Sequence, residues 1–209
     1  MQITVFGATG KVGRIVVDEA LKRGYKVVAF VHSSADLPKD KKLRIVNGDV
    51  YNPEAVIEAI KGSDAVISAL GSWGTPNKDI LKSGMQNIIP AMQQNNVKRI
   101  ISLTGHGANA PGDKFELLHF VSRLMLVIAA PRILHDGEDH ILQLAASKLD
   151  WTVVRSSLME EHGNPNRFTL TLKRPLPLAM IHRKAVATSL VNLAENTDFN
   201  KQAPFILRK

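Results

Sequence analysis

The stretch Gly7-Ala8-Thr9-Gly10-Lys11-Val12-Gly13 decides the fold of this 209-residue chain. It follows the apolar run Ile3 to Phe6 and opens a segment with helical periodicity, Ile15 to Arg23. Free backbone N–H groups at the start of a helix can face an anion. A strand, a glycine-rich turn and a helix in this order therefore predict a site for the pyrophosphate of a dinucleotide.

Each glycine of this turn has a separate expected task. Gly7 lets the chain turn sharply, Gly10 removes a side chain where phosphate must approach, and Gly13 lets the helix pack closely on the strand. The spacing is G-x-x-G-x-x-G rather than the G-x-G-x-x-G of the standard fingerprint. The alternative interpretation is a tight strand-to-helix turn that binds nothing.

The composition excludes several kinds of protein. The chain has no cysteine, which rules out disulfides, a thiolate nucleophile and Cys-ligated metals. The net charge is +8, but the basic residues are scattered without aromatic stacking partners or a reading helix, so we predict no specific nucleic-acid binding. Attraction of an anionic cofactor and substrate is the simpler account of the charge. No signal-peptide pattern precedes the first strand, which predicts a cytoplasmic protein.

The longest apolar stretch runs from Leu117 to Ala130. It carries His119 and Arg123 and is followed by Pro131, so it is too short and too interrupted to span a bilayer. We expect a core-facing helix here and no membrane partner. Because its apolar residues nearly encircle it, part of the surface is expected to meet a partner subunit in a homodimer.

Apolar runs typical of strands alternate with helical patterns along the chain. This alternation predicts an α/β fold of the Rossmann type, a doubly wound parallel sheet with helices on both faces. We expect one domain over residues 1–209, with residues 156–182 as a small substrate-side cap. The expected strands are Ile3 to Phe6, Lys26 to Val31, Leu43 to Val46, Ala65 to Leu70, Arg99 to Leu103, Trp151 to Arg155, Phe168 to Leu172 and Pro204 to Leu207.

Local signals also predict where helices begin and end. Asn52 caps a helix that Gly62 ends, and Asp113 and Asp136 are expected to cap two later helices, the second continuing to Lys148. Further helices are expected from Lys78 to about Asn95, with Pro90 as a kink or break, and from Arg183 to Glu195.

Several short motifs at the ends of strands carry a resemblance to a known family. They are the glycine turn, Gly48-Asp49-Val50, Ala69-Leu70-Gly71 and Thr104. With them the chain resembles the atypical short-chain dehydrogenase/reductase superfamily, most closely the NmrA-like NAD(P)-binding proteins and the flavin reductase / biliverdin-IXβ reductase group. The resemblance covers nearly the full length, including Asp139-His140-Ile141 and the strand Trp151 to Arg155.

The resemblance implies a set of cofactor contacts. Backbone N–H groups would hold the pyrophosphate, an acceptor beside an apolar edge would border the adenine, and small residues would close over the far ribose. In that order these residues are Thr9, Gly10, Lys11 and Val12; Asp49 and Val50; and Ala69, Leu70 and Gly71. An ordinary turn residue is the alternative interpretation of Asp49.

The end of the second strand distinguishes NAD from NADP. His32 stands where the flavin reductase group carries an arginine, and Asp36 where a second arginine is expected. No acid replaces His32, so we predict a preference for NADPH, with NADH also accepted. The 2′-phosphate would be bound by His32 with Ser33 and Ser34, assisted by Lys11 or Arg14.

The catalytic candidates follow the fifth strand. Neither Tyr25 nor Tyr51 has a lysine four residues on, which argues against the Tyr-x-x-x-Lys mechanism of the superfamily. Reduction of a conjugated ring needs fewer catalytic side chains, because stacking over the nicotinamide supplies much of the positioning. We expect Thr104 to contact nicotinamide or substrate and His106 to act as an acid, against the alternative of a solvated loop.

Two departures from the flavin reductase pattern argue against a substrate of that specific class. Gly105 replaces a serine and Leu158 replaces a histidine. The leading hypothesis is an NAD(P)H-dependent reductase that passes hydride to a flavin-like, quinone-like or other conjugated acceptor. The rival is an NmrA-like dinucleotide sensor without turnover. A nucleotide-sugar epimerase is a third hypothesis, disfavoured by the small C-terminal part.

Two further groups of residues receive structural interpretations. His135 with Asp139, and Asp136 with His140, fall one helical turn apart, but helix capping explains them better than a metal site, so no metal is predicted. Arg155 is expected to organise nearby loops by charge-assisted hydrogen bonds rather than to perform catalysis.

Overall fold

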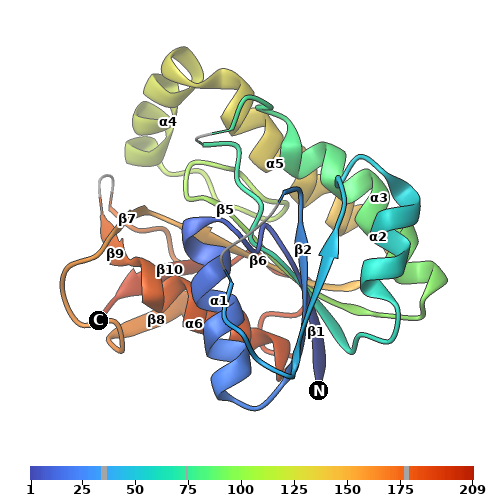
Figure 1. Ribbon diagram of the computed structural model, residues 1–209. Coiled ribbons are helices and arrows are strands. Elements are labelled where there is room, and N and C mark those ends of the chain that lie inside the picture. Colours follow the sequence, from blue (N-terminus) through green and yellow to red (C-terminus); the bar gives the residue numbers. More distant parts are fainter. Residues whose placement is uncertain (34–36, 74, 177–178) are drawn as a thin grey trace.

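The computed structural model describes residues 1–33, 37–73, 75–176 and 179–209. Its centre is an eight-stranded sheet with the strand order β3-β2-β1-β4-β5-β6-β10-β8, covered by helices on both faces (Figure 1). The sheet strands are β1 (Gln2–Phe6), β2 (Lys26–Val31), β3 (Leu43–Asn47), β4 (Ala65–Ser68), β5 (Arg99–Gly105), β6 (Asp150–Ser156), β8 (Phe168–Thr171) and β10 (Phe205–Arg208). The predicted fold class is confirmed.

The helices divide between the two faces of the sheet. Helices α1 (Lys11–Lys22) and α6 (Arg183–Ala194) contribute to one hydrophobic core, and α2 (Pro53–Ile60), α3 (Ile80–Gln94) and α5 (Pro131–Ala146) to the other. Along β1, Ile3 and Val5 belong to the first core and Phe6 to the second. Both faces are buried, as a parallel sheet requires.

The strand order reverses at β1, which pairs in parallel with both β2 and β4. Successive crossovers therefore run to opposite sides of this strand. In open α/β sheets, ligands bind outside the carboxyl ends of the strands at such a switch point. The glycine turn lies directly at this position, because it follows β1.

The segment 156–182, the expected substrate-side cap, contributes three strands. Strands β7 (Leu158–Glu160) and β9 (Met180–His182) form a separate parallel pair. Strand β8 pairs antiparallel with β10 and extends the main sheet. Whether this segment meets a substrate stays a prediction.

Two helix predictions near the centre of the chain are wrong. Helix α5 begins at Pro131, so Asp136 lies inside it and does not cap it. Helix α4 (Leu117–Ala129) starts after Glu116, and Asp113 makes ion pairs instead of a cap. Pro90 does not break α3, which is continuous through it.

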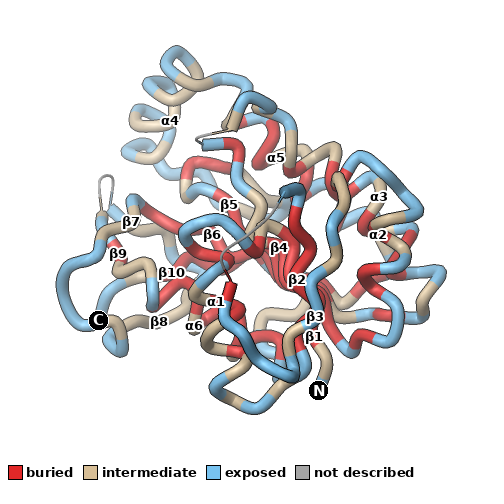
Figure 2. The backbone as a smooth tube through the Cα atoms, in the orientation of Figure 1, coloured by how far each residue is buried: buried red, intermediate tan, exposed pale blue. Residues whose placement is uncertain are grey.

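Helix α4 also contradicts the expectation of a core-facing helix. None of its residues, all within the described part of the chain, is buried (Figure 2). No single described helix meets the length and hydropathy needed to cross a membrane; α4 and α5 meet them only as a pair, bent by 116°.

His140 is a buried histidine that couples stability to pH. Its Nε2 lies 3.2 Å from the Ser102 hydroxyl and its Nδ1 2.8 Å from the Gly137 carbonyl. Complete burial lowers the pKa of His140 to about 4. The imidazole is therefore neutral in the folded protein at neutral pH and donates from Nδ1 to the carbonyl.

We expect the protein to lose stability as the pH falls from 6.5 towards 4. In this range the unfolded chain takes up a proton on His140 and the folded chain does not, so acid favours unfolding. In denaturant titrations, His140→Gln should reduce the dependence of the unfolding free energy on pH by about 1 kcal/mol per pH unit between pH 5 and 6. Ser102→Ala, the control, should lower stability with an unchanged slope. An unchanged slope for His140→Gln would contradict this assignment.

Candidate functional site

The glycine turn is held by close backbone contacts. Gly7 has φ +71°, and a Cβ there would lie 2.6 Å from the Ala69 carbonyl oxygen. A Cβ on Gly13 would lie 2.0 Å from the Gly7 carbonyl oxygen. Any side chain at Gly7 or Gly13 would thus displace backbone. The sharp turn at Gly7 is confirmed, and Gly13 packs on the turn itself rather than on the strand.

The start of α1 leaves backbone donors available. Gly10 is the N-cap residue, and within the described residues no side-chain hydrogen bond caps this end of α1. By contrast, Asn52 Oδ1 accepts from the Ala55 N–H at 3.1 Å at the start of α2, as predicted. Thr9, Gly10 and Lys11 are exposed. This open, uncapped helix start suits a pyrophosphate.

The expected adenine side contains a contact between a histidine and a carboxylate. His32, directly after β2, places Nε2 3.2 Å from Asp49 Oδ2, and both side chains are exposed. Asp49 Oδ1 also accepts from the Tyr51 N–H at 3.0 Å, so the turn interpretation of Asp49 applies as well. Ser33 is described and exposed. The expected roles of Ser34 and Asp36 concern positions outside the described residues.

The other residues expected to contact the cofactor lie just after the neighbouring strands β3 and β4. Val50 is buried, and its carbonyl accepts from Asn87 Nδ2 at 2.8 Å, which ties this edge to α3. Ala69 donates its N–H to the Phe6 carbonyl at 2.9 Å. Gly71 is exposed, and a Cβ there would meet nothing within 4 Å.

Arg14, which is expected to assist at the 2′-phosphate, lies over the glycine turn. Its Nε donates to the Thr9 carbonyl at 3.0 Å, so the guanidinium folds back over the turn. This places a cation beside the helix start at which an anion is expected. Lys11 stands exposed at the same end of α1.

The two catalytic candidates lie at the carboxyl end of β5. Thr104 is buried, and its hydroxyl oxygen would be 2.5 Å from a Cβ on Gly137, so it packs against α5. His106 is half-buried, and its backbone N–H donates to the Ser156 carbonyl at 2.8 Å. Burial, aided by the charge of Arg174, lowers the pKa of His106. Its imidazole is therefore neutral at neutral pH.

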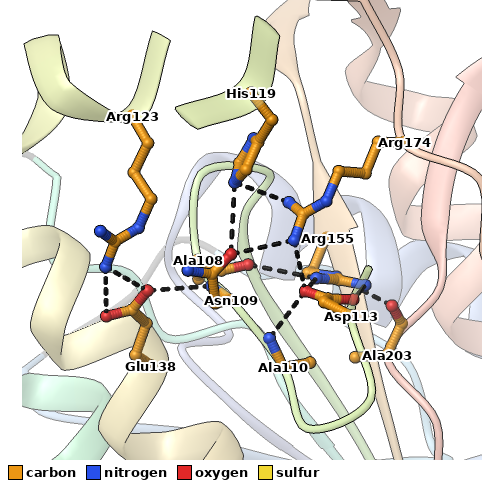
Figure 3. A network of polar contacts seen from close by, with 10 residues as sticks. All are labelled: Ala108, Asn109, Ala110, Asp113, His119, Arg123, Glu138, Arg155, Arg174 and Ala203. Carbon is orange, nitrogen blue, oxygen red and sulfur yellow. Dashed lines mark hydrogen bonds and ion pairs between the residues drawn. The ribbon is translucent and has the colours of Figure 1, made fainter. Parts of the chain in front are cut away.

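A buried ion-pair network covers the ends of β5 and β6 (Figure 3). Arg155 donates to Asp113 through both terminal nitrogens, at 2.5 and 2.9 Å, and to the carbonyls of Ala108 and Ala203. Arg174 donates to the same carboxylate at 2.7 Å. Burial alone would raise the pKa of Asp113, but the hydrogen bonds from Arg155 and Ala110 outweigh it and hold the pKa below its ordinary value. The predicted loop-organising role of Arg155 is confirmed.

The same network attaches α4 to the body of the protein (Figure 3). Arg174 donates to His119 Nε2 at 2.7 Å, and burial with the charge of Arg174 lowers the pKa of His119 to about 4. Arg123 makes a bidentate pair with Glu138 at 2.7 and 3.0 Å. Both ionisable side chains of α4 thus point towards the protein. The sequence predicted that Arg155 organises loops, but it did not predict which residues Arg155 contacts.

Asp136 caps a helix, but not its own. It accepts from the backbone N–H groups of Leu81 and Lys82, at 3.2 and 2.8 Å, and from the Ser72 hydroxyl. Burial raises the pKa of Asp136 despite these hydrogen bonds. The carboxylate fixes the start of α3 next to the loop that follows β4, close in sequence to Gly71.

The comparison with known families agrees with this geometry. The sequence profile of a family described as NAD(P)H-binding matches residues 7–197, from the first glycine of the turn to just beyond α6. The chain belongs to this NAD(P)H-binding family. The resemblance identified from the short motifs is confirmed.

Curated relatives match parts of the chain. The photosystem II assembly factor Ycf39 of Synechocystis is 33% identical over 106 residues, which are 48% of this chain and 32% of the relative. The 40 kDa subunit of NADH-ubiquinone oxidoreductase from Neurospora crassa is 26% identical over 181 residues, or 78% of this chain and 48% of the subunit. The chain thus spans a third to a half of the length of these relatives.

Solved structures share the whole fold. The oxidoreductase ylbE from Lactococcus lactis has a TM-score of 0.82 at 19% identity, covering 100% of this chain and 91% of its own. ChuY, an anaerobillin reductase from Escherichia coli O157:H7, has a TM-score of 0.79 at 17% identity, with coverages of 100% and 97%. At these identities the likeness establishes the Rossmann fold.

The roles expected for the residues around the nicotinamide remain predictions. Gly105 leaves open space, since a Cβ there would meet nothing within 4 Å, and Leu158 is exposed. Among the described residues, no group of three or more His, Asp or Glu is arranged to hold a metal.

Two glycine substitutions separate folding from cofactor binding. Gly10→Ala places a Cβ 3.2 Å from the Gly7 carbonyl oxygen, a contact that a small shift accommodates. We expect this variant to melt within a few degrees of the parent protein and to bind NADPH at least about tenfold more weakly in calorimetry. Gly13→Ala, the comparison, should lose both thermal stability and binding. Unchanged affinity in Gly10→Ala would show that the phosphates do not approach Gly10.

Proposed function

We propose that the protein is an NAD(P)H-dependent reductase that passes hydride to a flavin-like, quinone-like or other conjugated acceptor. The observation that carries the proposal is the uncapped start of α1 at the point where the strand order reverses, within a chain of the NAD(P)H-binding family. Reductases among the structural neighbours, such as ChuY, support this reading. The proposal assigns the pyrophosphate to the N–H groups of Thr9, Gly10, Lys11 and Val12.

For the cofactor we propose a modest preference for NADPH over NADH. His32 and Ser33 follow β2, and Arg14 and Lys11 lie at the start of α1, so donors and cations gather on this side of the turn. A structural neighbour from Veillonella parvula, at 15% identity, is described in complex with NADP. Asp49 limits the preference, because its carboxylate lies 3.2 Å from His32 and would repel a 2′-phosphate.

At the other end of the cofactor the chain supplies little acid–base machinery. The bound nicotinamide would supply the hydride. We propose that His106 relays a proton from water to the reduced acceptor and that Thr104 borders the nicotinamide. Because the fold lowers the pKa of His106, its imidazolium form releases a proton readily, which suits a relay. The open space at Gly105 suits a broad, flat acceptor.

A dinucleotide sensor without turnover is the second candidate. It is favoured by the missing Tyr-x-x-x-Lys pair and by the buried position of Thr104, whose hydroxyl packs against α5. The sensor would bind the same cofactor through the same turn. Turnover is therefore the property that separates the two functions.

The test is oxidation of NADPH, followed by its absorbance, against a panel of flavins, quinones and aldehydes. We expect turnover with at least one conjugated acceptor and none with simple aldehydes. Tight cofactor binding without oxidation across the panel would favour the sensor.

The role of His106 predicts a pH effect on turnover. The fold lowers the pKa of His106, so its protonated form appears only as the pH falls below 6.5. Turnover should rise on acidification, and His106→Ala should abolish this rise while leaving the affinity for NADPH within about twofold. His135→Ala, on the exposed surface of α5, is the control. An identical profile in His106→Ala would remove the residue from the chemistry.

The choice of cofactor is tested by removing the charge of Asp49. Asp49→Asn should strengthen NADPH binding about threefold with little effect on NADH, because it removes a carboxylate next to the proposed 2′-phosphate position. Asp40→Asn is a matched control, since Asp40 likewise accepts from a backbone N–H two residues on. Equal changes for the two cofactors would contradict the placement of the 2′-phosphate beside His32.

A further inference from the structure

Helix α4 has its polar side turned inward and its apolar side turned outward. His119 and Arg123, its only ionisable residues, are engaged by Arg174 and Glu138 on the side facing the protein. The opposite side carries large apolar side chains, and the helix stands at the periphery of the molecule without a buried residue (Figure 2). This is the reverse of a surface helix that covers a core.

The outward side has the spacing of a helix-pairing seam. Leu117, Val121, Leu124 and Ile128 follow one another at intervals of four, three and four residues, with Phe120 and Met125 on either side. These six side chains are between 48% and 77% exposed. In heptad terms, leucine occupies both d positions and a β-branched residue both a positions, a combination typical of helix pairs.

The size of the patch favours a protein occupant. The six side chains present on the order of 600–700 Å² of apolar surface, near the roughly 800 Å² that each partner buries in a standard interface. Isolated monomers rarely expose contiguous apolar patches above a few hundred Å². A second copy presents the same seam, so a two-fold axis across α4 would cover both patches at once.

A membrane surface is less well matched to α4. Helices that lie on membranes carry free lysine and arginine on their polar side to meet anionic headgroups. In α4 the one arginine is held by Glu138 in a bidentate pair. We propose that α4 is the centre of a homodimer interface, in which the seam of one copy packs against the seam of the other. This proposal does not depend on the cofactor or the reaction.

Sedimentation velocity over a range of micromolar concentrations tests the proposal. We expect a reversible dimer for the parent chain and for Ile45→Lys, a control at an exposed apolar position on β3. Leu124→Lys should raise the dimer dissociation constant at least about tenfold while keeping the melting temperature and NADPH affinity of the parent chain. A dimer unaffected by Leu124→Lys would overturn the proposed interface. So would a monomeric parent chain, whether or not it cosediments with vesicles of phosphatidylcholine and phosphatidylglycerol.

The absence of cysteine from the chain permits a direct second measurement. Leu124→Cys introduces a single thiol near the middle of the seam, and Ile45→Cys introduces one far from it. Oxidation should give a disulfide-linked dimer from the first variant and not from the second. Equal cross-linking of both would indicate random collision and contradict the interface.

Discussion

The close approach of Gly13 to the Gly7 carbonyl is the constraint on which the rest of this structure depends. Only glycine allows α1 to start so near the end of β1, since a Cβ on Gly13 would lie 2.0 Å from that oxygen. The contact directs the first-turn N–H groups of α1 towards the end of the sheet at which the strand order reverses. The positive end of the α1 dipole, its first-turn N–H donors and the reversal of strand order at β1 therefore lie at one place.

The carboxyl edge of the sheet is held by buried polar contacts that are not themselves part of the proposed chemistry. Asp113 is shared by Arg155 and Arg174, and Asp136 ties the start of α3 to the loop after β4. Asp113 is paired with two arginines and Asp136 accepts hydrogen bonds from two backbone N–H groups, so both carboxyl groups hold loops from distant parts of the chain in one arrangement. His106 lies among these loops, and its environment disfavours the imidazolium ion.

Polar contacts also attach α4 to the body of the protein. The polar attachments of α4 run through His119 and Arg123, Leu126 packs half-buried against Gly107, and most of the other large apolar residues of α4 face outward. A helix that is attached through its polar side chains leaves most of its apolar side exposed to another surface. The protein thus separates a cofactor edge built from backbone donors from a candidate association surface built from leucine, valine and isoleucine.

The sequence by itself determined the α/β fold class, the glycine turn, the Asn52 cap and the family, because each depends on residues adjacent in the chain and on regular periodicity. It also marked Arg155 as an organiser of loops. Only the tertiary structure decided what depends on distant partners. Asp113 and Asp136 have the local pattern of helix caps, yet the fold places Arg155 and Arg174 beside the first and the start of α3 beside the second. Hydropathy predicted an apolar helix at α4, but the side facing the core carries the hydrogen bond of His119 with Arg174 and the ion pair of Arg123 with Glu138, partners that periodicity cannot reveal.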